Sequence, residues 1–130
     1  MVNEMKENVI KTKSFAFAVR VVNVYKFLTS EKKEFVMSKQ LLRSGTAVGA
    51  LYREAEQGES KQDFIHKMGI AQKECNETIY WLELLQATEY LDDAQFNSVN
   101  SDAIELMKLI TSIIKSAKTS IKHWQLTINN

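Results

Sequence analysis

The feature that most constrains the fold is a run of seven residues, mostly apolar or small, whose spacing alternates between four and three. These residues are Phe64, Met68, Ala71, Cys75, Thr78, Leu82 and Leu85. Spacings of three and four place side chains on one face of an α-helix, and three heptads of them are typical of a bundle seam. We therefore expect a long amphipathic helix over residues 61–90.

A second run with the same alternation follows after a short polar segment. Its members are Phe96, Val99, Ala103, Leu106, Ile110, Ile113 and Ala117. This run predicts another helix over residues 93–119. Both helices are preceded by residue pairs typical of a capping box: Ser60 with Asp63, and Asp92 with Gln95.

The segment before these runs is apolar over a wider arc. We expect a helix over residues 14–28, with Ser14 as its N-cap. Two apolar stripes run along it. One consists of Phe15, Ala18, Val22 and Tyr25, and the other of Phe17, Val21, Val24 and Leu28. Together they cover about 180° of the helix surface, more than the ~100° that one buried face needs. Such a helix lies deep in a bundle or contacts a second subunit.

A further helix is expected over residues 31–57, with small residues in its seam. The seam combines Phe35, Leu42 and Gly49 with Ser38, Gly45 and Tyr52. Glycine inside a helix costs about 1 kcal/mol relative to alanine, so a neighbouring helix should come close there. A break at Ser44–Gly45, which would divide the segment into two shorter helices, is the alternative.

These four segments predict one all-α domain over residues 1–130. Residues 1–13 are read as a polar N-terminal arm and residues 120–130 as a C-terminal tail. Proline is absent and there are only four glycines, which disfavours a β-sandwich or barrel. Because the predicted loops are short, neighbouring helices must run antiparallel, which predicts an up-down-up-down four-helix bundle.

The residues that could carry chemistry are sparse. The single cysteine, Cys75, lies in the seam and is expected to be a small core residue. Asp63 and His66 could share a metal ion, but nothing repeats that pair. We therefore predict no catalytic residue, no metal site and no cofactor. No apolar run is long enough for a membrane span and no secretory signal is visible, so a cytoplasmic protein is expected.

Cationic side chains form the more suggestive pattern. Positive charges are in excess in residues 1–73 and negative charges in residues 74–130. The candidate nucleic-acid-binding residues are Arg20, Lys32, Lys39, Arg43 and Arg53, while Lys108, Lys115 and Lys122 repeat every seven residues. Such stripes can contact phosphates without reading bases. Alternatively, they are solvated helix faces or pair with acidic residues of neighbouring helices.

Surplus apolar residues suggest contact between copies of the chain. The candidate interface residues are Phe17, Phe27, Tyr80, Trp81 and Leu84. They add apolar surface beyond one seam per helix, as at an oligomer interface. The alternative is that they cover helix ends within one subunit.

The segment from Lys13 to Ala117 resembles the 23S rRNA intervening-sequence protein family. The resemblance is carried by KSFAFAVRVV at 13–22, SKQLLRSGTAVGA at 38–50, KQDFIHKMGIAQKECNETIYWLELL at 61–85 and LITSIIKSAK at 109–118. It implies antiparallel four-helix bundles assembled as homopentamers around a central channel. Leu51 stands where the family usually has Asn. A polar role of that Asn would be lost here.

The resemblance also bears on function. A related group acts as the accessory protein of diversity-generating retroelements, in which a basic pentamer binds nucleic acid and a reverse transcriptase. We therefore expect a homo-oligomer that binds RNA or DNA, with a reverse transcriptase or another nucleic-acid enzyme as a further partner. Two alternatives stay open: a structural scaffold whose basic residues pair with Glu54, Glu74 or Glu77, and a metalloenzyme with an ion near His66.

Overall fold

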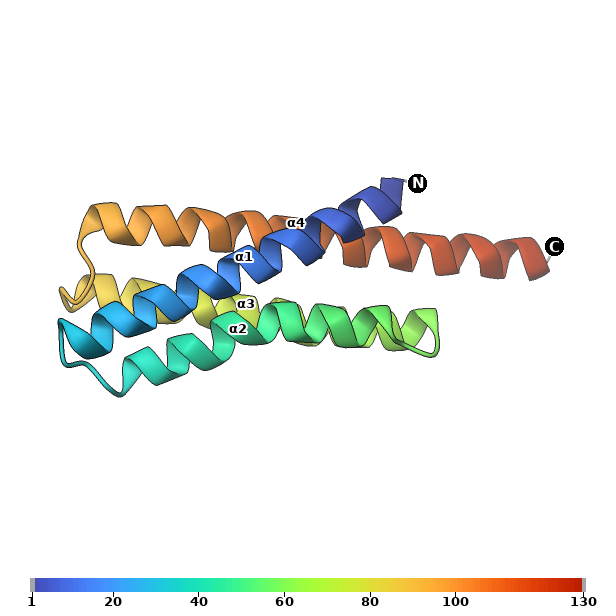
Figure 1. Ribbon diagram of the computed structural model, residues 1–130. Coiled ribbons are helices and arrows are strands. Elements are labelled where there is room, and N and C mark those ends of the chain that lie inside the picture. The colour runs from blue at the N-terminus through green and yellow to red at the C-terminus, as the bar shows by residue number, and fades with distance from the viewer. Residues whose placement is uncertain (1, 130) are drawn as a thin grey trace.

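Four helices build the protein, as the computed structural model shows for residues 2–129, with side chains described for residues 4–127. They are α1 (Val2–Ser30), α2 (Met37–Glu56), α3 (Lys61–Ala87) and α4 (Asp93–Asn129). Contacts join α1 to α2, α2 to α3, α3 to α4 and α4 to α1. The predicted up-down-up-down bundle is confirmed, and α1 and α3 lie on its diagonal (Figure 1).

The seams predicted for α3 and α4 form the centre of the core. Met68, Cys75 and Leu82 on α3 are 0% exposed, as are Ala103 and Ile110 on α4. The capping pairs are also confirmed. The Asp63 amide donates to Ser60 Oγ at 3.0 Å, and Asp92 and Gln95 exchange backbone-to-side-chain hydrogen bonds of 2.7 and 2.9 Å.

The predicted polar arm over residues 1–13 is wrong, because α1 begins at Val2. Ile10 is 0% exposed and Ser14 1%. Ile10 and Ser14 belong to the same buried seam as Phe17, Val21 and Leu28. Successive members of this seam are three, four or seven residues apart. Ser14 is therefore an interior helix residue at the contact with α2, and not an N-cap.

The start of α2 also differs from the expected boundary. Residues 31–36 form a loop, and the helix begins at Met37. The cause is Glu34, whose carboxylate accepts hydrogen bonds from the amides of Val36, Met37 and Ser38 at 2.6–3.0 Å. An anion at a helix N-terminus satisfies free amides and complements the helix dipole. Phe35, expected in the seam, lies in this loop and is 53% exposed.

The core face of α2 is shifted from the predicted seam. Ser38, Gly45 and Tyr52 are buried as expected, but the remaining core residues are Leu41, Ser44, Val48 and Ala55. The helix is continuous through Gly45, so the predicted alternative of a break at Ser44–Gly45 is wrong. A Cβ on Gly45 would lie 2.7 Å from Val21 Cγ2, so α1 and α2 approach closely there.

The last helix is longer than expected. Residues 120–130 were predicted to be a tail, but α4 continues to Asn129 and its last turns project beyond the other helices (Figure 1). At the other boundary, α3 ends at Ala87, three residues earlier than predicted. No helix among residues 2–129 is long and apolar enough to cross a membrane.

We predict that Gly45→Ala destabilises the protein by about 1–2 kcal/mol. Alanine favours the helix by about 1 kcal/mol, but overpacking against Val21 typically costs more. Gly69 on α3 is the matched control, since a Cβ there meets nothing within 4 Å. Gly69→Ala should stabilise the protein by about 1 kcal/mol. Urea denaturation measures both, and equal effects of the two substitutions would contradict the close approach.

Candidate nucleic-acid and subunit interfaces

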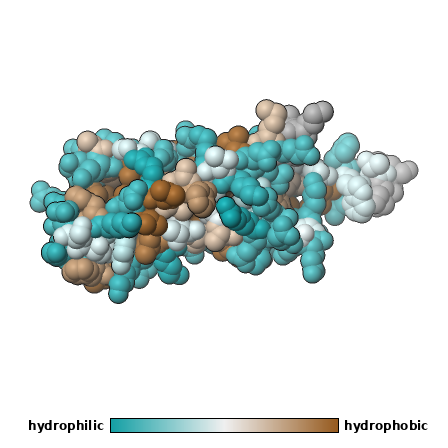
Figure 2. Space-filling view, viewed as in Figure 1, coloured by the Kyte–Doolittle hydropathy of each residue, from teal (hydrophilic) through white to brown (hydrophobic). Residues whose placement is uncertain are grey.

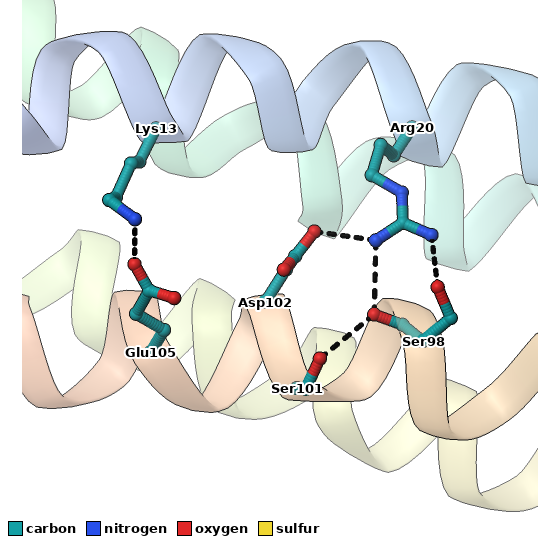
Figure 3. Close-up of polar contacts among 6 residues, drawn as sticks. All are labelled: Lys13, Arg20, Ser98, Ser101, Asp102 and Glu105. Carbon is teal, nitrogen blue, oxygen red and sulfur yellow. Dashed lines mark hydrogen bonds and ion pairs between the residues drawn. The ribbon is translucent and has the colours of Figure 1, made fainter.

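Arg20 joins α1 to α4. Its guanidinium contacts Asp102 Oδ2 at 2.6 Å, the Ser98 carbonyl at 3.0 Å and Ser98 Oγ at 2.6 Å (Figure 3). Ser101 Oγ donates to the same carbonyl. The planar fork of an arginine suits such multiple acceptors. The charge predicted to meet phosphate is thus directed at α4 of its own chain.

Lys13 makes a parallel link one heptad earlier. Its ammonium pairs with Glu105 on α4, and both side chains are about half exposed (Figure 3). With Arg20 and Asp102 this gives two ion pairs across the α1–α4 contact. Half-exposed pairs of this kind contribute little stability each, because water screens them. Their geometry fixes how α1 lies along α4.

Arg43 is also paired within the chain. Its Nη2 atom lies 3.6 Å from Glu77 Oε2, an oxygen that also accepts a 3.3 Å hydrogen bond from Trp81 Nε1. Arg43 is nevertheless two-thirds exposed. The cation of α2 is therefore partly neutralised by α3, while its outer side stays open to solvent.

The other three predicted cations are not in ion pairs with described carboxylates. Lys39 and Arg53 are exposed on α2, and the Arg53 guanidinium lies 5.5 Å from the Phe15 ring centroid. Lys32 is in the loop before α2, with its ammonium 5.9 Å from the Phe27 ring. The predicted basic stripe is thus reduced to Lys39, Arg53 and the outer side of Arg43.

The predicted subunit interface divides into buried and exposed members. Phe17 is 2% exposed and belongs to the core of its own chain, so its assignment to an interface is wrong. Phe27 and Trp81 are half-buried against that core, and Leu84 is also half-buried. Tyr80 is 55% exposed and packs edge-on against Trp81, with ring centroids 5.0 Å apart.

The prediction missed the apolar outer side of α1. Val19 lies two residues from both Phe17 and Val21, and two residues turn a helix by about 200°. Val19 therefore points away from the core and is 47% exposed, with Phe15 at 58% and Met5 at 68%. Figure 2 shows hydrophobic patches over α1 and α2 within a hydrophilic surface. The width of the apolar arc on α1 was the sequence signal for this face.

The residues with catalytic potential serve packing and capping. Cys75 is 0% exposed, and burial raises the pKa of its thiol to about 12, so the thiol is protonated at neutral pH. Asp63 Oδ2 accepts from the Glu59 amide at 3.3 Å in the cap of α3, and His66 is exposed. Within the described part of the chain, no three potential metal ligands lie together.

Tyr52 reports the electrostatics at the end of the bundle where α1 begins. Burial, together with the negative charges of Glu56 and Glu7, raises the pKa of its hydroxyl to about 12. Its hydroxyl is 3.5 Å from Glu56 Oε2. Leu51, the residue before it, is half-buried against the core. An apolar side chain therefore fits this position.

Comparison with known proteins places these features in context. The family model of the 23S rRNA-intervening sequence protein matches residues 6–112. A crystal structure of an S23 ribosomal protein family member from Bacteroides thetaiotaomicron, itself a protein of unknown function, is 63% identical with a TM-score of 0.84. The match covers 85% of this chain and 98% of that one. No curated relative matches the chain.

We predict that Arg20→Gln lowers the free energy of unfolding by about 1 kcal/mol, because Asp102 and Ser98 lose their partner. Lys39→Gln is the control, and should change stability by less than about 0.5 kcal/mol. A double-mutant cycle with Asp102→Asn, measured by urea denaturation at low and high salt, isolates the pair. A coupling energy of zero at low salt would show that the Arg20 contacts do not tie α1 to α4.

Proposed function

The chain belongs to the family of 23S rRNA-intervening sequence proteins, and on that premise we propose that it is a non-enzymatic, ring-forming homo-oligomer that binds nucleic acid without sequence preference. Five is the subunit number that the family resemblance implies. The observation that carries the proposal is the outer surface of α1 and α2, where exposed apolar side chains lie beside cations.

Two exposed apolar patches support self-association. The α1 patch consists of the exposed residues Met5, Phe15 and Val19, and the α3 patch of exposed Tyr80 with the half-buried Trp81 and Leu84. Exposed apolar side chains that gather on one face mark interaction sites on soluble proteins. A second copy of the chain offers a complementary apolar surface for each patch.

The positions of the two patches favour a ring over a two-fold dimer. Because α1 and α3 are diagonal in the bundle, their outer faces point in opposite directions. A two-fold dimer buries one patch against itself and leaves the other exposed. Contact between the α1 patch of one subunit and the α3 patch of the next buries both, and repetition of that contact closes a ring when the rotation between subunits is a whole fraction of a turn.

The cations of α2 support nucleic acid as the partner. Lys39 and Arg53 are exposed, and no described carboxylate pairs with them. In a ring each cation is repeated once per subunit, which multiplies the positive potential that a polyanion meets. Lysine and arginine without base-reading partners contact phosphates non-specifically.

A structural scaffold is the second candidate, and specific contacts favour it. Arg20 and Arg43 pair with Asp102 and Glu77 of their own chain, and Glu54 pairs with Lys67 at 3.5 Å. In this alternative the ring forms, and the basic residues hold helices together without contacting nucleic acid. Both candidate functions include the same ring of subunits, and only the first includes binding of RNA.

The ring predicts a specific pattern of complementation. A variant with Phe15→Glu and Val19→Glu keeps only the α3 patch, and a Tyr80→Glu variant keeps only the α1 patch. Each should be monomeric at about 15 kDa, because neither can repeat the contact. An equimolar mixture retains one intact contact and should form a heterodimer. Sedimentation velocity measures this, and assembly of either variant alone would contradict the alternating contact.

Nucleic-acid binding predicts salt-dependent mobility shifts. A labelled 30-nucleotide RNA should bind at 50 mM salt and bind about 50-fold more weakly at 200 mM, for roughly four phosphate contacts on a single strand. A second RNA of equal composition and scrambled order should behave alike. Absence of a shift at 50 mM salt would remove nucleic acid from the proposal and leave the scaffold.

A further inference from the structure

The outer face of α4 beyond Glu105 has cations and no carboxylate. Residues 106–130 contain no Asp or Glu, whereas Lys108, Lys115 and Lys122 repeat every seven residues. All three lysines are exposed, and none takes part in an ion pair among the described residues. This distinguishes them from Arg20 and Arg43, which face acids of their own chain.

The three lysines form a straight line along the helix. Seven residues advance an α-helix by about 10.5 Å and bring the side chain nearly back to the same direction. The line therefore spans about 21 Å. A regular polyanion can contact all three cations at once.

A hydroxyl-rich hollow lies beside this line, between α4 and the first turns of α1. Lys6 donates a 2.7 Å hydrogen bond from its ammonium to Ser112 Oγ. Ser116, Thr119 and His123 also line the hollow, together with Lys115. Lysine and hydroxyl side chains are the groups that commonly contact phosphate oxygens in nucleic-acid complexes. No carboxylate lines the hollow.

From Lys108 to Lys115 the surface does not suit a lipid bilayer, and the exposed apolar residues of this end of α4, Trp124 and Leu126, lie beyond Lys122. An interfacial helix needs its apolar side chains free to enter the membrane. At the level of Lys108 and Lys115, the apolar residues Ile110 and Ile113 are 0% and 5% exposed because they form the bundle core. Cations and hydroxyls are therefore what this part of α4 offers to a partner, which favours a nucleic-acid backbone.

We infer that the α4 lysine face, Lys108, Lys115 and Lys122 with the hollow beside Lys115, binds the phosphate backbone of a nucleic-acid strand. The inference rests on the proposed nucleic-acid binding and places its principal contact on α4, apart from the predicted cations of α2. Lys108 lies within the residues that the family model matches, and Lys115 and Lys122 lie beyond them.

The test compares two charge-matched triple variants of the full chain. One carries Lys108→Gln, Lys115→Gln and Lys122→Gln; the control carries Lys26→Gln, Lys33→Gln and Lys73→Gln, three exposed lysines elsewhere. Glutamine preserves helix propensity, and circular dichroism verifies equal helicity. Binding of the labelled 30-nucleotide RNA is measured by fluorescence anisotropy between 50 and 200 mM salt.

The α4 triple variant should lose about 2 from the slope of log K against log salt, because each lost contact to a single strand removes about 0.7. Affinity at 0.1 M salt should fall about 100-fold, and the control should stay within a few-fold of wild type. Equal loss in both variants, or an unchanged slope in the α4 variant, would show that the principal contact is not on α4. The proposed nucleic-acid binding would still stand in that case. No binding by the wild-type protein would overturn the proposed function as well, as would binding to phosphatidylserine vesicles in place of RNA.

Discussion

The close contact between α1 and α2 determines which side of α1 faces solvent. Gly45 lies against Val21, and Gly49 lies against Ser14, where a Cβ would be 3.3 Å from Ser14 Oγ. Small residues at these positions allow the two helices to approach, and the tight fit prevents α1 from turning about its axis. Ile10, Phe17 and Leu28 are thereby held inside, and Phe15 and Val19 outside. The apolar surface available to a partner follows from this contact.

The sequence predicted the parts of the fold that depend on local spacing. The seams of α3 and α4 and their capping boxes were identified because three- and four-residue spacings translate directly into one helix face. The first residues of α1 and α2 were not predicted correctly, because they depend on distant or unusual contacts. Ile10 joins the core only when α1 meets its neighbours, and Glu34 caps α2 with a carboxylate that lies outside the helix.

For the candidate sites, the sequence predicted which helix face carries each residue but not which residues lie opposite it. Helical spacing placed Arg20, Lys39 and Arg43 on outer surfaces, but gave no information on which acids lie opposite them. Arg20 and Asp102 are 82 residues apart in sequence, and only the antiparallel arrangement of α1 and α4 brings them within 2.6 Å. Chain composition was more informative on α4, where the absence of acids after Glu105 excludes ion pairs within that stretch of the helix. The structure adds that no described carboxylate of another helix pairs with Lys108, Lys115 or Lys122.

In the proposed assembly, a further copy of the chain covers apolar residues on two diagonal helices, α1 and α3. Hydroxyl-radical footprinting across protein concentrations tests this most directly. Phe15 and Tyr80 should both become protected as assembly proceeds, while Phe35, which has similar exposure in the α1–α2 loop, should be oxidised at a constant rate. Oxidation of Phe15 and Tyr80 at an unchanging rate at every concentration, or protection of only one of them, would contradict the alternating contact.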